Sequence, residues 1–585
     1  MHSQVFQLRL QLGYGRIPLN SVLRPPALTP HLGRAHIPIH VFFSVVCLYC
    51  CFFSGRHGFM AGEAQARGGL HQGLIRSPCR GDETGVMPPT PPGRSAHTRP
   101  MRPAPSPWPA EFRRRMEALL GEEAAAFFEA LSQPRARGMR INPAKAGATE
   151  LGRLLQLELT RVPWSELGFT FEGKAGLGDR PAHRAGLFYL QDPAAMSVVE
   201  VMDPRPDWRV ADVAAAPGGK TTHLLSRLGK EGLVFANDVA GSRLAVLHEN
   251  LDRWGATGVV TASIELDDLA ESLPEAFDAV LLDAPCSAEA LLRRDPALLS
   301  QWSPAAVSGA ARRQGRLLAA AARLVRPGGV LVYSTCTFEV EEDESQVAAF
   351  LERQPEWKLA EVVRRPGFDP GVQLPPWPTE RTVRLWPHRL PGDGQFVARL
   401  ERRADVHRRG PRPEDPAGPG RGPRRARSRR PDPGSDRQVV RQWEEFVAQT
   451  CPGLQLPPGH PLARGPYLYH VAAPAQPLPV SRLARPGTPL GAGRPGRFQP
   501  SHALACMLDP DQVNSRVSWT ERDEELKRFL RGETVESAGS DGWVLVCYER
   551  WGIGWGRRSK GVIKNFLPRQ LRRREGRGRE VEEEV

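Results

Sequence analysis

The sequence predicts an α/β fold: a Rossmann-like, doubly wound sheet, with a small N-terminal α/β subdomain before it and a C-terminal β-rich module after it. Two observations predict this architecture. Between residues 196 and 401, apolar segments of strand length alternate with segments of helical spacing, a pattern typical of a mostly parallel sheet with crossover helices. A turn of small residues at 214–220 follows the first apolar segment, and such turns hold ligands in these sheets.

The size and charge of the chain bound its domain count and its partners. At 585 residues it exceeds one compact core, so roughly two to four domains are expected. The formal net charge of +14 indicates a polyanionic partner, most simply nucleic acid. An arginine-rich segment at 402–437 supplies part of this excess, so a merely solvated basic tether is an alternative source of the charge.

The cysteines and the hydropathy of the N-terminal region indicate the cellular compartment of the protein. Nine scattered cysteines without paired metal spacing are typical of reduced thiols, so we expect a cytoplasmic protein that holds no metal. The apolar run at 38–53 is shorter than the ~20 residues that cross a bilayer, and no membrane association is expected.

Residues 1–105 lack regular periodicity. We interpret them as a disordered extension or a misread start, with Met101 or Met116 beginning the working protein.

The N-terminal subdomain is expected at 106–195. Apolar residues at helical spacing predict a helix over 111–131, and residues 139–142 form a predicted short strand. Segment 186–197 then leads into a helix that ends near Met202.

The ligand-binding sheet is expected at 196–401. The predicted helices start at Thr221 and span 242–254 and about 310–325, and the predicted strands are 210–213, 232–238, 258–261, 277–283 and 329–334. Because the carboxyl ends of parallel strands share one edge, Asp212, Asp238, Asp283 and the residues after Ser334 are expected to lie together there.

Beyond the sheet we expect a flexible basic linker at 402–437, a C-terminal region at 438–574 and a charged tail at 575–585. The predicted elements of the C-terminal region are a short amphipathic helix at 439–446 and segments at 465–470, 498–505, 542–548, 552–558 and 560–566. The last three interleave Trp, Arg and Lys between turn glycines, which favours an RNA-contacting module. The alternative is that the aromatic residues form a core.

The turn at 214–220 allows three interpretations. Glycines collect at any strand–helix boundary. A phosphate-binding loop is the second, because residues 219–221 (Gly-Lys-Thr) close a Walker-like pattern and 279–283 resembles its acidic partner strand. Against it, Ala214 stands where that loop opens with glycine, and Pro217 lacks a backbone donor that the phosphates need. The third interpretation is an S-adenosylmethionine site.

Carboxylates at the strand ends favour the third interpretation. Asp238 stands 26 positions beyond Asp212, at the end of the next predicted strand, where a carboxylate accepts both ribose hydroxyls of a nucleotide-like cofactor. Asp238 would serve equally as a cap of the helix that begins near Ser242. Glu265 follows the third strand, where it would accept from the adenine amino group.

Two cysteines, Cys286 and Cys336, also follow strand ends. A thiol in such a place is most often a small apolar filler. Two thiols on the ligand edge of one sheet indicate covalent catalysis, since a thiolate that adds to carbon 6 of a pyrimidine turns carbon 5 into a nucleophile for a methyl group. The thiolate needs nearby positive charge, which Lys220 or the pair Arg293 and Arg294 would supply.

Five motifs, in this order and spacing, resemble those of the Sun-type (NOL/NOP/Sun) RNA (cytosine-5)-methyltransferases: Asp212-Val-Ala-Ala-Ala-Pro-Gly-Gly-Lys-Thr221, Leu282-Asp-Ala-Pro-Cys-Ser287, Arg294-Asp-Pro296, Pro327-Gly-Gly329 and Tyr333-Ser-Thr-Cys-Thr337. The resemblance runs from about residue 109 to residue 400, and the segments 381–388 and 392–396 extend it. Segment 542–572 resembles the PUA-like C-terminal domain of the bacterial RsmF type, which acts on small-subunit (16S) ribosomal RNA.

The resemblance implies a role for each motif. Cys336 would be the nucleophile at carbon 6, and Cys286 would assist breakdown of the adduct as its general base. Asp283 would hold the cytosine ring or the methyl donor, and Lys220 would support the donor or this aspartate. Arg140 and Asn142 would support the target-nucleotide side. The S-adenosylmethionine pocket would be lined by Ala214, Ala215, Ala216, Pro217, Gly218, Gly219, Lys220, Asp238, Glu265 and Asp283.

The chain departs from the family pattern at four positions. Ala215 stands where the family often has cysteine, and Gln395 where histidine is common. Ala288 and Ala290 stand where the family usually has glycines. Alanines would stiffen or crowd the turn beside Cys286, which bears on rate or substrate geometry more than on reaction class.

The expected function is S-adenosylmethionine-dependent methyl transfer to carbon 5 of a cytosine in ribosomal RNA. The target base would be turned out of its helix into the pocket. The expected protein is a monomer that binds structured RNA or the small ribosomal subunit. One alternative, a P-loop-like nucleotidase, has no use for Cys286 and Cys336. The other is a non-catalytic RNA-binding ribosome-assembly factor on the same fold, against which the two intact cysteines argue.

Overall fold

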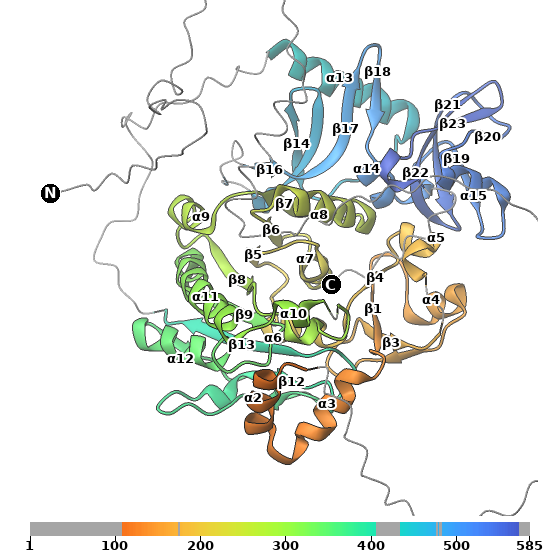
Figure 1. The fold of residues 1–585 in the computed structure, drawn as a ribbon. Coiled ribbons are helices and arrows are strands. Elements are labelled where there is room, and N and C mark those ends of the chain that lie inside the picture. The colour runs from red at the N-terminus through yellow and green to blue at the C-terminus, as the bar shows by residue number, and fades with distance from the viewer. Residues whose placement is uncertain are drawn as a thin grey trace, which may run out of the picture. The chain divides into compact units, whose positions relative to one another are not determined.

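The computed structural model describes residues 108–173, 176–295, 297–404, 433–475, 478 and 483–572. The predictions for residues 1–105, for most of the basic linker and for the charged tail lie outside these residues. The described residues belong to one compact unit, drawn from orange to blue in Figure 1. No helix in this described part is long and apolar enough to cross a membrane.

A ten-stranded sheet organises the unit, in the order β11-β12-β13-β9-β8-β5-β6-β7-β16, with β10 paired to β13. β10 spans Trp357–Leu359, β11 spans Asp369–Pro370 and β16 spans Leu483–Arg485. Its central strands are parallel: β5 (Arg209–Asp212), β6 (Leu233–Asn237), β7 (Val259–Ala262), β8 (Phe277–Asp283) and β9 (Val325–Thr335). Beyond β9, the sheet continues antiparallel through β13 (Gln395–Arg402) and β12 (Val383–Leu385). The predicted doubly wound sheet is confirmed, and its centre is parallel. The sheet as a whole is mixed rather than mostly parallel, because β10, β11, β12, β13 and β16 pair antiparallel.

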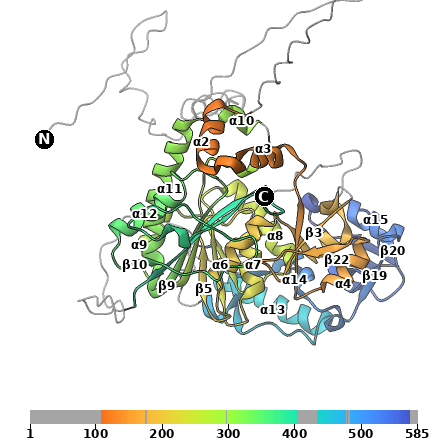
Figure 2. The same ribbon diagram turned by 90° about the horizontal axis from the view of Figure 1, so that it is seen from below.

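Helices cover both faces of this sheet, as Figures 1 and 2 show. One face packs against α9 (Leu266–Ser272), α11 (Pro304–Leu324) and α12 (Glu344–Arg353). The other packs against α6 (Ser197–Met202), α7 (Gly219–Arg227) and α8 (Gly241–Trp254). Strands that are buried on both faces need apolar side chains at successive positions, which is why Phe277 and residues 279–282 are almost wholly buried.

The N-terminal subdomain contains a second, four-stranded sheet, ordered β2-β3-β1-β4. Its strands are β1 (Arg137–Ile141), β2 (Leu159–Arg161), β3 (Gly168–Phe171) and β4 (Phe188–Leu190), and its helices include α4 (Ala148–Leu155) and α5 (Pro181–Arg184). Before the sheet, α2 (Ala110–Leu120) and α3 (Ala124–Ser132) stand where one helix was predicted. Gly121 ends α2 because its φ of +56° is left-handed and leaves the helix.

The C-terminal region forms two β-rich bodies. The first contains α13 (Pro433–Thr450), longer than predicted, α14 (His502–Met507) and a sheet of β14 (Gly459–Arg464), β15 (Tyr467–Ala472), β17 (Thr488–Arg494) and β18 (Arg497–Pro500). The second contains α15 (Glu524–Arg531) and a five-stranded sheet of β19 (Arg516–Trp519), β21 (Gly542–Tyr548), β22 (Trp551–Ser559), β23 (Val562–Asn565) and β20 (Val535–Glu536). The predicted β-rich C-terminal module is confirmed.

Among the strands that were not predicted from the sequence, β16 links two parts of the chain. β16 (Leu483–Arg485) pairs antiparallel with β7 and so extends the large sheet with a segment of the C-terminal region. Its Leu483, together with Val471 and Leu478, belongs to the core beneath α9 and α11. The C-terminal region therefore shares a core with the sheet that carries the candidate site.

Candidate active site

The turn at 214–220 joins β5 to α7, as predicted. Gly218 has a φ of +116°, a conformation that L side chains rarely adopt, and α7 begins at the next residue. The backbone N–H of Ala216 donates to Asp238 Oδ2 at 3.2 Å, and that of Ala215 donates to the carbonyl of Asn237 at 2.9 Å. The turn is therefore fixed against the end of β6.

Asp238 is buried and lies just beyond the end of β6. Besides the bond to the turn, its Oδ1 accepts from the backbone N–H of Ala240 at 3.0 Å, directly before α8. Arg243 Nη1 lies 3.3 Å from Asp238 Oδ2. Asp238 therefore fixes the turn and accepts from the residue before α8, but α8 has no side-chain cap. Of the two roles that the sequence left open, helix capping is not found, and the ribose contact remains a prediction. Glu265 is exposed at the start of α9.

Asp212 ends β5 and is buried beneath the turn. Burial raises the pKa of Asp212 to about 7, although the hydrogen bond from Thr221 Oγ1 to its Oδ2, at 2.7 Å, acts in the opposite direction. Its other oxygen, Oδ1, is buried without a hydrogen-bond partner among the described residues. An unpaired buried acceptor is costly, so this atom is available to a ligand that carries a donor.

Lys220 and Asp283 form an ion pair at the edge where β5 and β8 end. Lys220 Nζ donates to Asp283 Oδ2 at 2.7 Å, and Ser334 Oγ donates to Asp283 Oδ1 at 2.7 Å. Burial by itself lowers the pKa of Lys220, but the charge and hydrogen bond of Asp283 raise it above its ordinary value overall. Lys220 is therefore a fixed positive charge.

The two cysteines meet at the same edge. Cys286 Sγ lies 3.3 Å from Cys336 Sγ, and both side chains are half-buried free thiols. The hydrogen bond with Cys336, together with burial, raises the pKa of the Cys286 thiol well above its ordinary value. Either sulfur atom can be the donor of this contact. Lys220 and Arg294 both lie within electrostatic reach of Cys336.

The loops that follow the two cysteines are hydrogen-bonded to each other. Ser287 Oγ lies 2.7 Å from Thr337 Oγ1, and the backbone N–H of Ala290 donates to the carbonyl of Cys336 at 3.0 Å. Thr337 Oγ1 in turn donates to Glu289 Oε2 at 2.9 Å. These contacts hold the two sulfur atoms together.

Glu289 is the buried centre of this network. Its Oε2 also accepts from the backbone N–H of Phe338 at 3.0 Å, and its Oε1 accepts from Trp302 Nε1 at 2.7 Å. Burial raises the pKa of Glu289 to about 8. Sequence reasoning missed this residue, for which the only signal is its place three positions after Cys286.

Two buried aspartates hold Arg294 beside Cys336. Arg294 Nε donates to Asp393 Oδ2, and Arg294 Nη2 lies 3.3 Å from Asp192 Oδ2. Burial and the charge of Asp393 raise the pKa of Asp192 to about 6. Arg293 Nη1 lies 3.7 Å from Asp393 Oδ1. Both sources of positive charge that the sequence proposed, Lys220 and the arginine pair, are therefore present.

Arg140 and Asn142 lie inside the protein. Arg140 is fully buried, donating from Nη2 to the carbonyl of Gly219 at 3.1 Å and from Nε to Gln191 Oε1 at 3.1 Å. Asn142 Nδ2 donates to the carbonyls of Gly186 and Trp254, each at 3.0 Å. Both residues tie the N-terminal subdomain to helices of the sheet, Arg140 at the start of α7 and Asn142 at the end of α8.

The four departures from the family pattern lie close to the candidate site or in it. Ala288 has a φ of +59°, the left-handed region that favours glycine, as expected of an alanine at a glycine position. Ala290 and Ala215 are buried. Gln395 is buried at the start of β13, and its Nε2 has no hydrogen-bond partner among the described residues.

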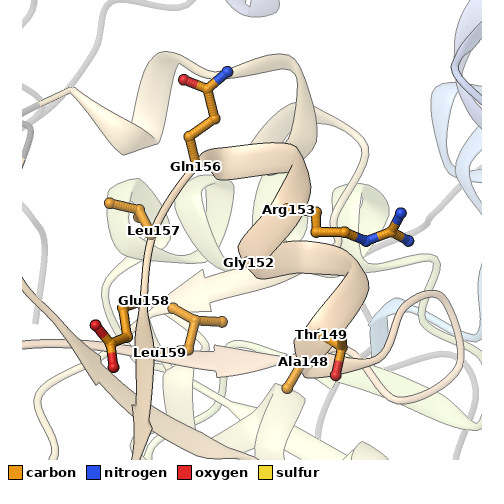
Figure 3. A pocket seen from close by; sticks show the side chains of 8 residues that line it. All are labelled: Ala148, Thr149, Gly152, Arg153, Gln156, Leu157, Glu158 and Leu159. Carbon is orange, nitrogen blue, oxygen red and sulfur yellow. The ribbon is translucent and has the colours of Figure 1, made fainter.

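A cavity of about 550 Å³ lies elsewhere, between α4 and residues 156–159 of the N-terminal subdomain (Figure 3). None of the candidate residues lines it. The candidate site is therefore defined by the ends of β5, β6, β8 and β9 rather than by this cavity.

Four family models match consecutive parts of the chain. They describe the N-terminal domain of 16S rRNA methyltransferase RsmF (108–193), 16S rRNA methyltransferase RsmB/F (199–401), the first C-terminal domain of the RsmF rRNA methyltransferase (445–508) and the methyltransferase RsmF PUA domain (521–573).

Named proteins and solved structures are similar as well. Ribosomal RNA small subunit methyltransferase F of Erwinia tasmaniensis is 31% identical over 482 residues, which cover 79% of this chain and 96% of that protein. The protein of the same name from Klebsiella pneumoniae is 32% identical over 459 residues, covering 76% and 92%. A methyltransferase homolog protein from Pyrococcus horikoshii, a crystal structure, is 30% identical, with a TM-score of 0.45, over 50% of this chain and 94% of that one.

Proposed function

Because the chain belongs to the RsmF family of 16S rRNA methyltransferases, we propose that it transfers a methyl group from S-adenosylmethionine to carbon 5 of a cytosine in 16S rRNA, through a covalent adduct with Cys336. One observation carries the proposal: two thiols lie 3.3 Å apart at the carboxyl ends of adjacent strands, beside the Lys220–Asp283 pair. Neither a nucleotidase nor a pure binding protein needs this arrangement, and family membership does not favour either alternative.

The hydrogen-bonding groups around the turn fit S-adenosylmethionine, which supplies an electrophilic methyl group when bound. Acceptors stand at the ends of β5, β6 and β7, namely the unpaired Oδ1 of Asp212, Asp238 and the exposed Glu265. They match the amino and hydroxyl donors of this cofactor. We propose that the pocket is lined by Ala214, Ala215, Ala216, Pro217, Gly218, Gly219, Lys220, Asp238, Glu265 and Asp283.

Cys336 would begin the reaction as a thiolate. Its sulfur lies 3.3 Å from that of Cys286 and near the positive charges of Lys220 and Arg294, and positive charge favours the anion. A bond forms between this sulfur and carbon 6 of the cytosine, and the displaced electron pair makes carbon 5 nucleophilic. Carbon 5 then takes the methyl group as the carbon–sulfur bond of the donor breaks. Asp283, fixed by Lys220 and Ser334, would hold the cytosine ring.

Cys286 would complete the reaction as the general base. Its pKa is raised by a hydrogen bond to Cys336, and that cause disappears once the sulfur of Cys336 is bonded to carbon 6. Cys286 then releases its own proton to solvent, and its thiolate removes the proton from carbon 5. The electron pair restores the aromatic ring and expels Cys336 as a thiolate. Both cysteines thereby return to their starting protonation states, and the proton given to solvent balances the carbon-5 hydrogen that the methyl group replaces.

The proposal extends to partners and organisation. The PUA domain model and the 16S rRNA models imply an rRNA substrate, and the target base must be turned out of its helix to reach the cysteines. One chain supplies every proposed site residue, which supports a monomer, and rRNA with reduced thiols supports a cytoplasmic location. We retain the proposed boundaries of 106–195 and 196–401. The proposed boundary at 437/438 lies inside α13 (Pro433–Thr450), so the C-terminal part begins at or before residue 433.

Two substitutions test the roles of the cysteines. Cys336→Ala removes the nucleophile, so we expect it to abolish methylation while the protein still binds RNA. Cys286→Ala removes the base, so we expect a covalent protein–RNA adduct that survives denaturing electrophoresis. Cys506→Ala, which changes a buried thiol of α14, is the matched control and should methylate normally. Normal methylation by both Cys336→Ala and Cys286→Ala would refute the mechanism.

Cofactor and substrate can be tested separately. Calorimetry should detect binding of S-adenosylhomocysteine but not of ATP, and the opposite result would favour the nucleotidase. Bisulfite sequencing of 16S rRNA from a strain that lacks the gene should show the loss of a 5-methylcytosine, which would also identify the target nucleotide.

A further inference from the structure

Glu289 carries a buried carboxyl group that the proposed reaction leaves without a role. The residue opens the short 3₁₀ helix η5 (Glu289–Leu291), three positions after Cys286, and none of its surface is exposed. Burying a carboxyl group costs free energy unless its hydrogen bonds are satisfied. The partners of Glu289 therefore indicate what the protein gains from it.

The partners of this carboxyl group lie on the other cysteine loop and before α11. Its Oε2 accepts from Thr337 Oγ1 at 2.9 Å and from the backbone N–H of Phe338 at 3.0 Å, the two residues that follow Cys336. Its Oε1 accepts from Trp302 Nε1 at 2.7 Å. One side chain thus joins the loop after Cys286 to the loop after Cys336.

A second carboxyl group, that of Glu339, faces Glu289. Burial raises the pKa of Glu339, and a hydrogen bond with the Glu289 side chain acts in the opposite direction. Two carboxyl groups share a hydrogen bond only when one of them holds a proton. Both oxygens of Glu289 already accept from N–H or O–H donors, and Glu339 Oε1 is buried without a donor among the described residues. A proton on one of the two carboxyl groups supplies the missing donor.

Arg115 of α2 decides which of the two carboxyl groups holds this proton. Arg115 Nη1 donates to Glu339 Oε2 at 2.9 Å, and a cation at this distance favours the ionised form. Burial and the charge of Glu339 raise the pKa of Glu289 to about 8, so Glu289 is the protonated partner at neutral pH. The other charged groups that face the pair come from three places: Glu111 of α2, Glu341 and Glu342 before α12, and Arg384 of β12.

We propose that Glu289 is a positioning residue, whose neutral carboxyl group keeps Cys286 and Cys336 at the separation that the reaction needs. It acts through Thr337 and the backbone N–H of Phe338 rather than on the base or the methyl donor. Loss of its proton would place two carboxylates side by side in the protein interior, where like charges repel strongly. The loops would then separate, and with them the two sulfur atoms. The reaction of the cysteines rests on the proposed function, whereas the contacts of Glu289 do not.

Disulfide formation measures the separation of the two sulfur atoms without any methylation. Diamide takes up one hydrogen atom from each thiol, and the sulfur atoms must close from 3.3 Å to about 2.05 Å to form the bond. The Cys286–Cys336 disulfide is quantified by mass spectrometry of the digested full chain at pH 7. Glu289→Ala should slow its formation by about 10- to 100-fold, the cost of a misplacement of about 1 Å. Glu289→Gln keeps a neutral hydrogen-bonding group and should recover most of the wild-type rate.

The pH profile of methylation tests the neutral form of Glu289. The kcat of the wild type, with saturating S-adenosylmethionine and RNA, should fall about 10-fold between pH 7 and pH 9 relative to that of Glu289→Gln. The reason is that a group with a pKa of about 8 is about nine-tenths protonated at pH 7 and about one-tenth protonated at pH 9. The KM for RNA should stay the same, since no RNA contact is lost. Glu200→Gln, which changes a buried carboxyl group of α6 that accepts from Ser165 Oγ at 2.7 Å, is the matched control and should keep the wild-type profile.

The outcomes separate this proposal from the proposed function. Wild-type rates of disulfide formation and of methylation in Glu289→Ala would overturn the positioning role. Equal pH profiles for the wild type and Glu289→Gln would overturn it as well, and this comparison decides the question if the urea midpoint of Glu289→Ala shows that this variant does not fold. A wild-type protein whose disulfide formation depends on Glu289 but which methylates no RNA would refute the proposed function alone.

Discussion

Cys286 and Cys336 differ because of the groups that face them. The carboxyl of Glu342 contributes to the raised pKa of Cys286, whereas Lys220 and Arg294 interact with Cys336. The surroundings of the two sulfur atoms thus differ, although the side chains are chemically identical. This difference supports the proposed roles of Cys336 as the nucleophile and Cys286 as the base.

The buried carboxyl of Asp212 predicts a pH dependence of stability. Its pKa of about 7 lies above the ordinary value of 3.8, so the folded state binds the proton more tightly than the unfolded state. The resulting stabilisation is complete below about pH 3.8 and is lost as the pH rises through about 7. We expect the urea midpoint of the wild type to fall, relative to that of Asp212→Asn, between about pH 4 and pH 7. Parallel curves for the two proteins would contradict this expectation.

Ala288 predicts a stabilising substitution. A left-handed conformation costs an L residue roughly 1–2 kcal/mol, and replacing Ala288 by glycine removes this cost. Glycine also has more conformational freedom in the unfolded chain, which lowers the free energy of unfolding by about 0.4–1 kcal/mol and so cancels part of the gain. Ala288→Gly should therefore raise the free energy of unfolding by about 0.5–1 kcal/mol, measured by urea denaturation. Ala290→Gly is the control two residues away. Its backbone is not left-handed and its side chain is buried, so it should destabilise instead.

At the scale of elements, the site depends on how the segment after Cys336 is anchored. Arg384 of β12 is buried and donates to both carboxylate oxygens of Glu344 at the start of α12, at 2.7 and 2.6 Å. Its Nη1 also donates to the carbonyl of Phe338 at 3.0 Å. Phe338 packs on Phe127 of α3, with ring centroids 5.0 Å apart. Strand, helix and loop thus fix the carboxyl end of β9 from two sides.

Arg384→Met is expected to destabilise the protein by about 3–5 kcal/mol, because it leaves buried carboxylates without their partner. It should also lower methylation, since the loop after Cys336 loses its anchor. Arg389→Met is the control. Arg389 pairs with Glu123 through two hydrogen bonds of 2.8 and 2.6 Å, but both side chains are substantially exposed, and exposed pairs contribute at most about 1 kcal/mol. Equal losses in the two variants would show that burial does not decide the effect.

The sequence predicts best those elements whose burial requires a recognisable run of apolar residues in the sequence itself. The strands ending at Asp212 and Asp283 are buried on both faces, so their apolar runs are continuous and their ends are recognisable. The break at Gly121 has no such signal, because apolar spacing continues on either side of it. β16 is only three residues long, too short for any periodicity.

The parts of the site that the sequence did not predict depend on contacts between distant segments. Asp192 accepts from the backbone N–H of Asp393, 201 residues away, and Ser287 meets Thr337 across 50 residues. Glu289 resembles any surface glutamate in sequence, and its pKa is raised by burial and by the charge of Glu339, a residue 50 positions away. Cys286 and Cys336 were predictable because thiols at two strand ends are rare enough to stand out, whereas carboxylates are common.

At the scale of the whole molecule, the C-terminal region is packed onto the catalytic sheet and the N-terminal subdomain. Besides the pairing of β16 with β7, Arg485 Nη1 donates to Asp252 Oδ1 of α8 at 2.6 Å. Trp551 Nε1 donates to the carbonyl of Lys145 at 3.0 Å, and Arg180 pairs with Glu521 at 2.6 Å. A region that supplies RNA contacts thereby also completes the core of the sheet.

This packing predicts that the catalytic part is not stable alone. A chain that ends at residue 404 would lose β16 and with it the cover of β7, whose unpaired edge would then be free to pair with another chain. It would also expose the apolar partners of Val471, Leu478 and Leu483. We expect this truncated protein to aggregate in size-exclusion chromatography, whereas co-expression with residues 433–585 should restore a soluble complex. A monodisperse truncated protein would contradict the shared core.

A single substitution separates the edge contact from the other contacts of the C-terminal region. Leu483 is buried under the sheet edge, so Leu483→Asp places an unpaired charge in the core and should cost on the order of 3 kcal/mol or more. Arg485→Ala removes only the partly exposed ion pair with Asp252 and should cost about 1 kcal/mol. If Leu483→Asp unfolds in urea with the midpoint of Arg485→Ala, then β16 is an appendage to the sheet. A clearly lower midpoint for Leu483→Asp means that the RNA-contacting region and the catalytic sheet fold as one body.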